Sequence, residues 1–153
     1  MDIRSQRKAL GFEDAVVRFF RFLEADNGFY RTEQSELGVR FESETVFIDV
    51  FHGLKDYEVG ICFGLLSEKR YFSFNLYVHR FFPERVAELA EEIAGTPDKV
   101  LQAVERLSAL FKSVGQKIVE ADAKTYEEMK SVKWWHFRPE VLRPKVPRGE
   151  NSD

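Results

Sequence analysis

Three histidines and one cysteine are the side chains of this sequence best suited to bind a metal ion. His52 and His79 each follow a run of apolar residues, so at strand ends they could meet Asp49 and form a metal site. Strand-end histidines are more often plain surface residues, and the sequence has no Cys pair and no His-Glu-x-x-His motif. We therefore expect no metal site. Cys62 lies inside an apolar run, which indicates a buried small side chain.

Signatures of hydrolases and nucleotide-binding proteins do not occur in the sequence. It has no Gly-rich phosphate loop with a lysine and no Gly-x-Ser-x-Gly motif. A metal nuclease would pair Asp49 with an acid-x-Lys motif on the next strand, but the second residue after Glu58 is Gly60. The sequence therefore predicts a protein without catalytic residues and without a cofactor. The alternative is a small-ligand-binding or enzymatic domain, with a pocket between sheet and helices that uses Asp49, Tyr57 and Glu58.

The elements that would position these side chains lie between residues 39 and 79. Val46, Ile48 and Val50 alternate with residues 47, 49 and 51, which places the two sets on opposite faces of a strand. Short polar separators at 53–56 and 67–69 are typical of hairpins. Strands are predicted at 39–43, 45–52, 57–66 and 71–79, with 29–34 as a candidate for a first strand. The pattern predicts an antiparallel meander of four to five strands.

Helical periodicity precedes and follows this meander. Apolar residues at 16, 19, 20 and 23 predict one helix over 13–25, which Asn27 and Gly28 would end. Pro83 suits the first turn of a helix that would reach Ile93. Thr96 reads as the N-cap of a longer helix that ends at about residue 115, and a short helix follows over 124–132. The order predicts an α+β fold with an N-terminal helix and two to three C-terminal helices on one sheet face.

Composition indicates one domain with a sizeable core. The chain has 153 residues, of which 44% are hydrophobic and 15 are Phe. We expect residues 1–137 to form a single domain and 138–153, which contain three prolines among charges, to form a flexible tail. No stretch reaches the roughly 18 apolar residues of a membrane span, and the first residues lack the apolar run of a secretory signal. A cytoplasmic protein is expected.

Charge is unevenly distributed along the chain. Residues 24–49 contain seven acids and two bases, whereas residues 130–148 contain six bases and one acid. This asymmetry predicts two parts of the fold with different electrostatic fields. The alternative is that both segments are solvated surfaces without a partner.

Two aromatic groups have more than one interpretation. The segment Lys-Trp-Trp-His-Phe-Arg at 133–138 has the composition of a surface for single-stranded nucleic acid or a membrane interface, but we expect its rings to fold back onto the core. The second group combines aromatic rings with Asp49 and Asn75 on the sheet faces that the helices would leave uncovered. Exposed rings with a few acids are more typical of a protein interface than of a catalytic pocket.

The runs VRFESETVFIDVFHGLKDYEVGICFGLL and VGQKIVEADAKTYEEMKS resemble small bacterial immunity-type proteins that are encoded beside polymorphic toxins. The resemblance covers residues 12–131. It implies a cytoplasmic protein without catalytic residues that binds a toxin domain tightly and masks it. The paired tryptophans and the tail of prolines and bases depart from this pattern.

These observations lead to the hypothesis of a binding protein whose acidic 24–49 region meets a basic protein surface, such as a toxin domain. Nucleic-acid binding ranks lowest because the folded part is acidic, no membrane partner is expected, and the oligomeric state is left open. The residues expected at the interface are Glu36, Glu42, Glu44, Phe47, Asp49, Phe51, Tyr71 and Tyr77.

Overall fold

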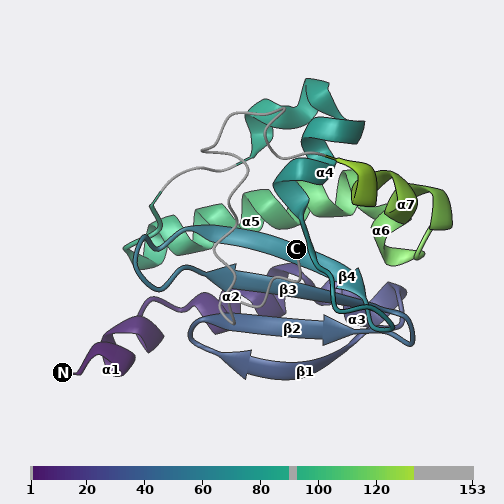
Figure 1. Ribbon diagram of the computed structural model, residues 1–153. Helices are drawn as coiled ribbons and strands as arrows, with labels where there is room; N and C mark the ends of the chain where they lie inside the picture. The colour runs from purple at the N-terminus through teal and green to yellow at the C-terminus, as the bar shows by residue number, and fades with distance from the viewer. Residues whose placement is uncertain (1, 90–92, 133–153) are drawn as a thin grey trace.

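The computed structural model describes residues 2–89 and 93–132, which form the predicted α+β fold: N-terminal helices, a five-stranded antiparallel meander and C-terminal helices packed on the sheet (Figure 1). The strands are β1 (Tyr30–Ser35), β2 (Gly38–Glu42), β3 (Val46–His52), β4 (Val59–Leu65) and β5 (Phe72–Ser73). The helices are α1 (Ile3–Lys8), α2 (Phe12–Phe19), α3 (Arg21–Asp26), α4 (Phe74–Phe81), the 3-10 helix η1 (Pro83–Glu88), α5 (Pro97–Val114), α6 (Gln116–Val119) and α7 (Ala123–Ser131). The predicted tail over 138–153 lies outside the described residues.

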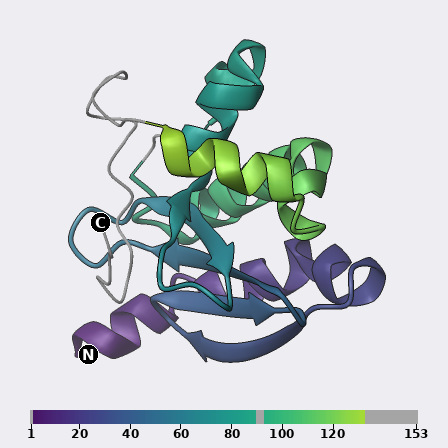
Figure 2. The same cartoon turned by 45° about the vertical axis from the view of Figure 1, so that its right-hand side comes forward.

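The sheet follows chain order, β1-β2-β3-β4-β5, and every pair is antiparallel. Its register places Arg40 opposite Asp49, Asp49 opposite Cys62 and Cys62 opposite Ser73. Directly paired residues share a face of the sheet, so these four side chains form one row across four strands. Figures 1 and 2 show β1 and β2 at one end of the sheet and the helices α4, α6 and α7 beyond β4 at the other.

One face of the sheet packs on the helices and forms the core. Val46, Ile48 and Val50, which the alternation placed together on one face, all belong to this core cluster. In Figure 1 the helices α2, α3 and α5 lie behind the sheet, on this side. The cluster also includes Val39, Phe41, Val59, Ile61 and Phe63 from the sheet, and Val16, Phe20, Leu23, Phe74, Tyr77, Val104, Leu107 and Phe111 from the helices. We call the opposite side, which carries residues 47, 49 and 51, the second face.

The N-terminal region is more divided than the single predicted helix. Phe20 departs from helical geometry (φ −99°, ψ 16°) and separates α2 from α3. Val16, Phe20 and Leu23 are nevertheless all buried, as their helical spacing predicted. An additional helix, α1, starts where the Asp2 carboxylate accepts a hydrogen bond from the Ser5 amide at 2.7 Å. Its six residues are too few to show a helical repeat.

The predicted strand over 71–79 is wrong beyond its first residues. β5 ends at Ser73, whose hydroxyl accepts a hydrogen bond from the Asn75 amide at 3.0 Å and thereby caps α4. Phe74, Tyr77 and Val78 are buried at helical spacing. A run of aromatic and aliphatic residues this dense fits both a period of two and a period of 3.6, so its alternation did not discriminate.

The predicted helix from Pro83 to Ile93 is also wrong in its second half. In the described part of this stretch the chain forms the 3-10 helix η1, which ends where Leu89 adopts an extended conformation (φ −69°, ψ 125°). Ile93 is 63% exposed and pairs with Glu58 as an isolated bridge, so it does not join an apolar stripe. Residues 90–92 lie outside the described part of the chain.

The long C-terminal helix confirms its predicted caps. The Thr96 hydroxyl accepts a hydrogen bond from the Lys99 amide at 3.3 Å, Pro97 occupies the first helical position, and α5 ends at Gly115. α7 follows the same rule, since the Asp122 carboxylate accepts from the Thr125 amide at 3.0 Å. Within residues 2–89 and 93–132, none of the helices is long and apolar enough to cross a membrane.

Candidate functional site

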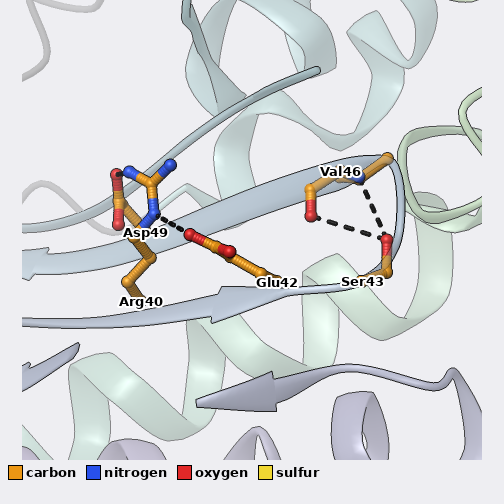
Figure 3. A network of polar contacts seen from close by, with 5 residues as sticks. All are labelled: Arg40, Glu42, Ser43, Val46 and Asp49. Atoms are coloured by element: carbon orange, nitrogen blue, oxygen red, sulfur yellow. Dashed lines mark hydrogen bonds and ion pairs between the residues drawn. The ribbon is translucent and has the colours of Figure 1, made fainter. Parts of the chain in front are cut away.

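An ion-pair chain lies on the second face of the sheet (Figure 3). Arg40 on β2 donates from Nη1 to Asp49 Oδ2 on β3 at 3.2 Å and from Nε to Glu42 Oε2 at 2.8 Å. The same guanidinium lies 4.2 Å from the centroid of the Phe47 ring, a cation–π contact. Arg40 is therefore held from three directions, and it fixes the side chain of Glu42 in turn.

Asp49 is a buried carboxylic acid at the centre of this face. Burial raises the pKa of Asp49 to about 6, although the charge of Arg40 lowers it, and the charge of Glu42 also raises it. Cys62 lies opposite Asp49 on β4 and is fully buried, as predicted. Burial first, and then the negative charge of Asp49, raise the pKa of the Cys62 thiol well above its ordinary value. A thiol in this state is a poor nucleophile, so this part of the face lacks a reactive sulfur.

Phe47 and Phe51 pack against glycines of β4. Phe47 pairs with Gly64 and Phe51 with Gly60, and a Cβ atom at these glycines would lie 2.7 Å and 2.5 Å from the respective rings. Phe47 is 8% exposed and Phe51 is 2% exposed. The expectation of exposed, available rings on this face is therefore wrong, because each glycine leaves space that the ring of the neighbouring strand fills.

The turn between β2 and β3 is tightly hydrogen-bonded (Figure 3). The Ser43 hydroxyl accepts from the Val46 amide at 3.0 Å and from the Thr45 amide at 3.2 Å, and the Ser43 amide donates to the Val46 carbonyl at 2.9 Å. Glu44 lies at the tip of this turn and is exposed. The hairpin thus presents a carboxylate to solvent from a rigid support.

Tyr30 extends this region onto the edge strand. It pairs with Glu42 in the register of β1 and β2, and its side chain is 57% exposed. Glu33 pairs with Arg40 and lies on the same side. We call Tyr30, Glu33, Glu42 and Glu44 the acidic edge. Sequence reasoning missed Tyr30 and Arg40, because only the strand register brings them beside Glu42 and Asp49.

Three of the predicted interface residues lie elsewhere. Glu36 is in the β1–β2 turn, at the other end of β2, where it pairs with Arg4 at 3.4 Å. Tyr77 is in the core on the helix side, where its hydroxyl donates to the Val114 carbonyl at 2.6 Å and burial raises its pKa to about 12. Tyr71 precedes β5 and is half-buried. Glu42, Phe47, Asp49 and Phe51 are the predicted residues that the fold brings together, with Glu44 beside them.

His52 belongs to a separate polar cluster on the core side. Its Nε2 donates to the Ala94 carbonyl at 2.9 Å, so its Nδ1 accepts from Arg7 Nη1 at 3.2 Å. Phe12 stacks on the ring at 5.2 Å, and the Arg7 guanidinium lies 3.9 Å from the Tyr57 centroid. Burial first, opposed by the bond to Ala94 and helped by the Arg7 charge, lowers the pKa of His52.

The groups that would have formed a metal site or a pocket lie in different parts of the structure. His52 and Tyr57 lie by α1, Asp49 faces away from the helices, and Glu58 bridges to Ile93. Among the residues that the structure describes, no group of three His, Cys, Asp or Glu side chains is placed to hold a metal ion. Asp49 and Tyr57 are therefore not positioned to act together in a pocket between sheet and helices.

Surface hollows in the described part of the chain are open and modest in size. One of them, of about 280 Å³, lies between α4 and the region of α6 and α7, and is lined by Tyr77, Phe81, Phe82 and charged residues of α6, α7 and the turn between them. Comparison with family models, curated proteins and solved structures gives no match to this chain.

Proposed function

We propose that this chain is a binding protein without catalytic activity, which neutralises a partner by covering a basic surface on it. The observation that supports this proposal is the acidic edge, where the exposed Tyr30 ring lies in register with Glu42 beside a rigid hairpin tip. An immunity protein that masks a toxin domain is the specific form of this function, and the resemblance of residues 12–131 supports that form.

Electrostatics favour a basic partner. The second face and its edge carry four carboxylates, Glu33, Glu42, Glu44 and Asp49, and Arg40 is the base that two of them share. Because Arg40 is already engaged, the remaining field of this side is negative. Opposite charge raises the rate of encounter with a basic surface and disfavours acidic competitors.

Rigidity and an aromatic anchor favour protein binding over loose charge attraction. Tyr is enriched at binding hot spots because its ring supplies a large contact area and its hydroxyl a hydrogen bond. Arg40 holds Glu42 before any partner arrives, and Ser43 holds the hairpin tip. Groups that are already ordered lose less conformational entropy on binding, so more of the interaction energy appears as affinity.

Co-expression with the products of the neighbouring genes in the native host tests the function directly. We expect one of these products to be toxic alone and harmless when this chain is present, and to form a complex with it. A chain that gives no protection and captures no neighbouring gene product would overturn the immunity proposal.

A charge reversal at the hairpin tip tests the surface. Glu44→Lys changes an exposed side chain, so the free energy of unfolding should change by well under about 1 kcal/mol. The association rate with the captured partner should fall at least about threefold at low salt, and the defect should shrink as salt screens the field. Glu105→Lys, at an exposed position of α5, is the matched control and should leave the rate nearly unchanged.

Tyr30→Ala tests the anchor in the same assay. We expect a faster dissociation rate, by about tenfold or more, with a nearly unchanged association rate. Glu44→Lys and Tyr30→Ala variants that both match the wild type at every salt concentration would remove the acidic edge from the interface.

A further inference from the structure

The edge strand β1 is open along its outer side. It is the first strand in the sheet order, and among the described residues it pairs with β2 alone. Figures 1 and 2 show it as the outermost strand, with no described element beyond it. Residues 30–34 are exposed and Ser35 is half-buried. The outer side of an edge strand carries a row of backbone N–H and C=O groups to which another strand can pair.

Side-chain hydrogen bonds connect β1 to the helices behind it. Arg31 donates from Nε to Glu24 Oε2 on α3 at 2.9 Å and from Nη1 to Gln34 Oε1 at 3.0 Å. Gln34 Nε2 in turn donates to Glu13 Oε1 on α2 at 3.1 Å. The edge strand is therefore held at two points along its length. A strand that is already ordered loses less conformational entropy when a second strand is added to it.

A groove lies beside β1 on the helix side of the sheet. Arg31 pairs with the core residue Phe41 and so lies on this side. The groove has a volume of about 360 Å³ and is lined by Arg31 of β1, Val17 of α2, and Arg21, Glu24 and Ala25 of α3. An extended peptide that adds to a sheet edge gains affinity from backbone hydrogen bonds and specificity from pockets for its alternate side chains. The groove is such a pocket.

The other side of β1 is acidic. Tyr30 and Glu33 pair with Glu42 and Arg40, which places both on the second face of the sheet. Although they are three residues apart, they share this face because the register shifts between them. A strand beside β1 would meet the Tyr30 ring and the Glu33 carboxylate here. Charge complementarity favours basic side chains on this side, whereas the two arginines of the groove disfavour them there.

We propose that β1 receives an extended strand of the partner protein, with basic side chains over the acidic edge and small apolar side chains in the groove. Val17 and Ala25 supply the apolar surface of the groove, and Glu24 offsets the charge of Arg31. The added strand would be the sixth of the sheet. This inference rests on the proposed function, because it names the part of the partner that the acidic edge would bind.

A peptide of alternating lysine and valine, as long as β1, is the probe. Added to the isotope-labelled full-length protein, it should bind saturably and slow the amide hydrogen exchange of residues 30–35. Two further versions carry a methyl group on alternate backbone nitrogens, in the two possible phases. Alternate backbone groups of a strand point to opposite edges, so one version should lose at least about tenfold in affinity and the other should keep it. No saturable binding, or two methylated versions that bind equally, would overturn strand addition.

Two variants test the two sides of the added strand. Glu33→Gln removes a charge at nearly constant shape, so peptide affinity should fall about two- to fivefold at low salt and match the wild type at high salt. Ala25→Lys places a long basic side chain in the groove and should weaken binding at least about tenfold. Ala109→Lys, at an exposed position of α5, is the matched control and should keep the wild-type affinity. Glu33→Gln and Ala25→Lys variants that both bind like the wild type would overturn the proposed site.

The captured partner separates this inference from the proposed function. In the complex of the two full-length proteins we expect residues 30–35 to be protected from hydrogen exchange. A partner that is bound and neutralised while these amides exchange freely would overturn strand addition and leave the proposed function standing. Peptide binding with the expected variant responses, but without any neutralised partner, would support the strand site and overturn the immunity proposal. Protection in the protein alone that disappears on dilution would assign the edge to a second copy and overturn the partner strand.

Discussion

Replacement of Asp49 by Asn should stabilise the protein at neutral and alkaline pH. The Asp49 residue is 8% exposed, and burial raises its pKa from 3.8 to about 6 even with Arg40 beside it. The folded state therefore favours the protonated form. Asn has nearly the same shape as protonated Asp and carries no charge, so it satisfies this site at every pH. Arg40 keeps Glu42 as an ion-pair partner in the variant.

The size of the effect follows from the pKa. A rise of about two pKa units corresponds to about 3 kcal/mol between the two protonation states. Because the pKa of Asp49 is higher in the folded than in the unfolded state, the favourable contribution of its protonated form to wild-type stability is complete below about pH 4. It is lost as pH rises through about 6. Loss of the Arg40–Asp49 contact offsets part of the gain. We expect Asp49→Asn to be more stable than the wild type by about 1 to 3 kcal/mol at pH 8 and by little at pH 4.

Urea denaturation between pH 4 and pH 8 measures this difference. The difference between variant and wild type isolates Asp49, since other groups such as His52 titrate alike in both proteins. Glu105→Gln, at an exposed position of α5, should show no comparable pH-dependent gain. If Asp49→Asn is less stable than the wild type at pH 8, the ion pair with Arg40 outweighs the burial of the charge and the reasoning is wrong.

Three further predictions concern the core, the glycine positions and the histidine cluster. Ile61→Ala should lower the free energy of unfolding by about 2 to 5 kcal/mol in urea, and a loss under about 0.5 kcal/mol would contradict its place in the core. Gly64→Ala should cost about 1 to 3 kcal/mol because its Cβ meets the Phe47 ring and the Arg70 carbonyl, whereas Gly95→Ala, which meets nothing within 4 Å, should be nearly neutral. Because burial lowers the pKa of His52, the contribution of the neutral ring to folding stability is complete above about pH 6.5 and is lost as pH falls through the pKa of the folded state. His52→Gln should therefore flatten the acid side of a plot of Tm against pH. Parallel curves for the two proteins would show that His52 does not titrate on folding.

Local patterns in the sequence were sufficient to predict the elements whose apolar residues fit one period only, either that of a strand or that of a helix. The alternation of Val46, Ile48 and Val50 with residues 47, 49 and 51 separated the two faces of the strand, and the structure shows that the first of these faces packs on the helices. Thr96 and Gly115 marked the ends of α5, because capping depends on neighbours in the chain. The same local logic failed for Phe74–Phe81, where apolar residues are dense enough to satisfy both the strand and the helix repeat.

The candidate site depended on contacts between strands, which no single segment determines. Its acids were visible in the sequence as a cluster between residues 24 and 49, but Glu36 and Glu42 lie at opposite ends of β2. Pairing in the sheet joined Tyr30 to Glu42 and Arg40 to Asp49, and it placed Phe47 and Phe51 against glycines that hide them. The sequence by itself determined the alternation within each strand and the caps of its helices, since these arise between near neighbours. Tertiary structure decided register, burial and the resulting charge of each carboxylate, because these depend on residues brought together from distant parts of the chain.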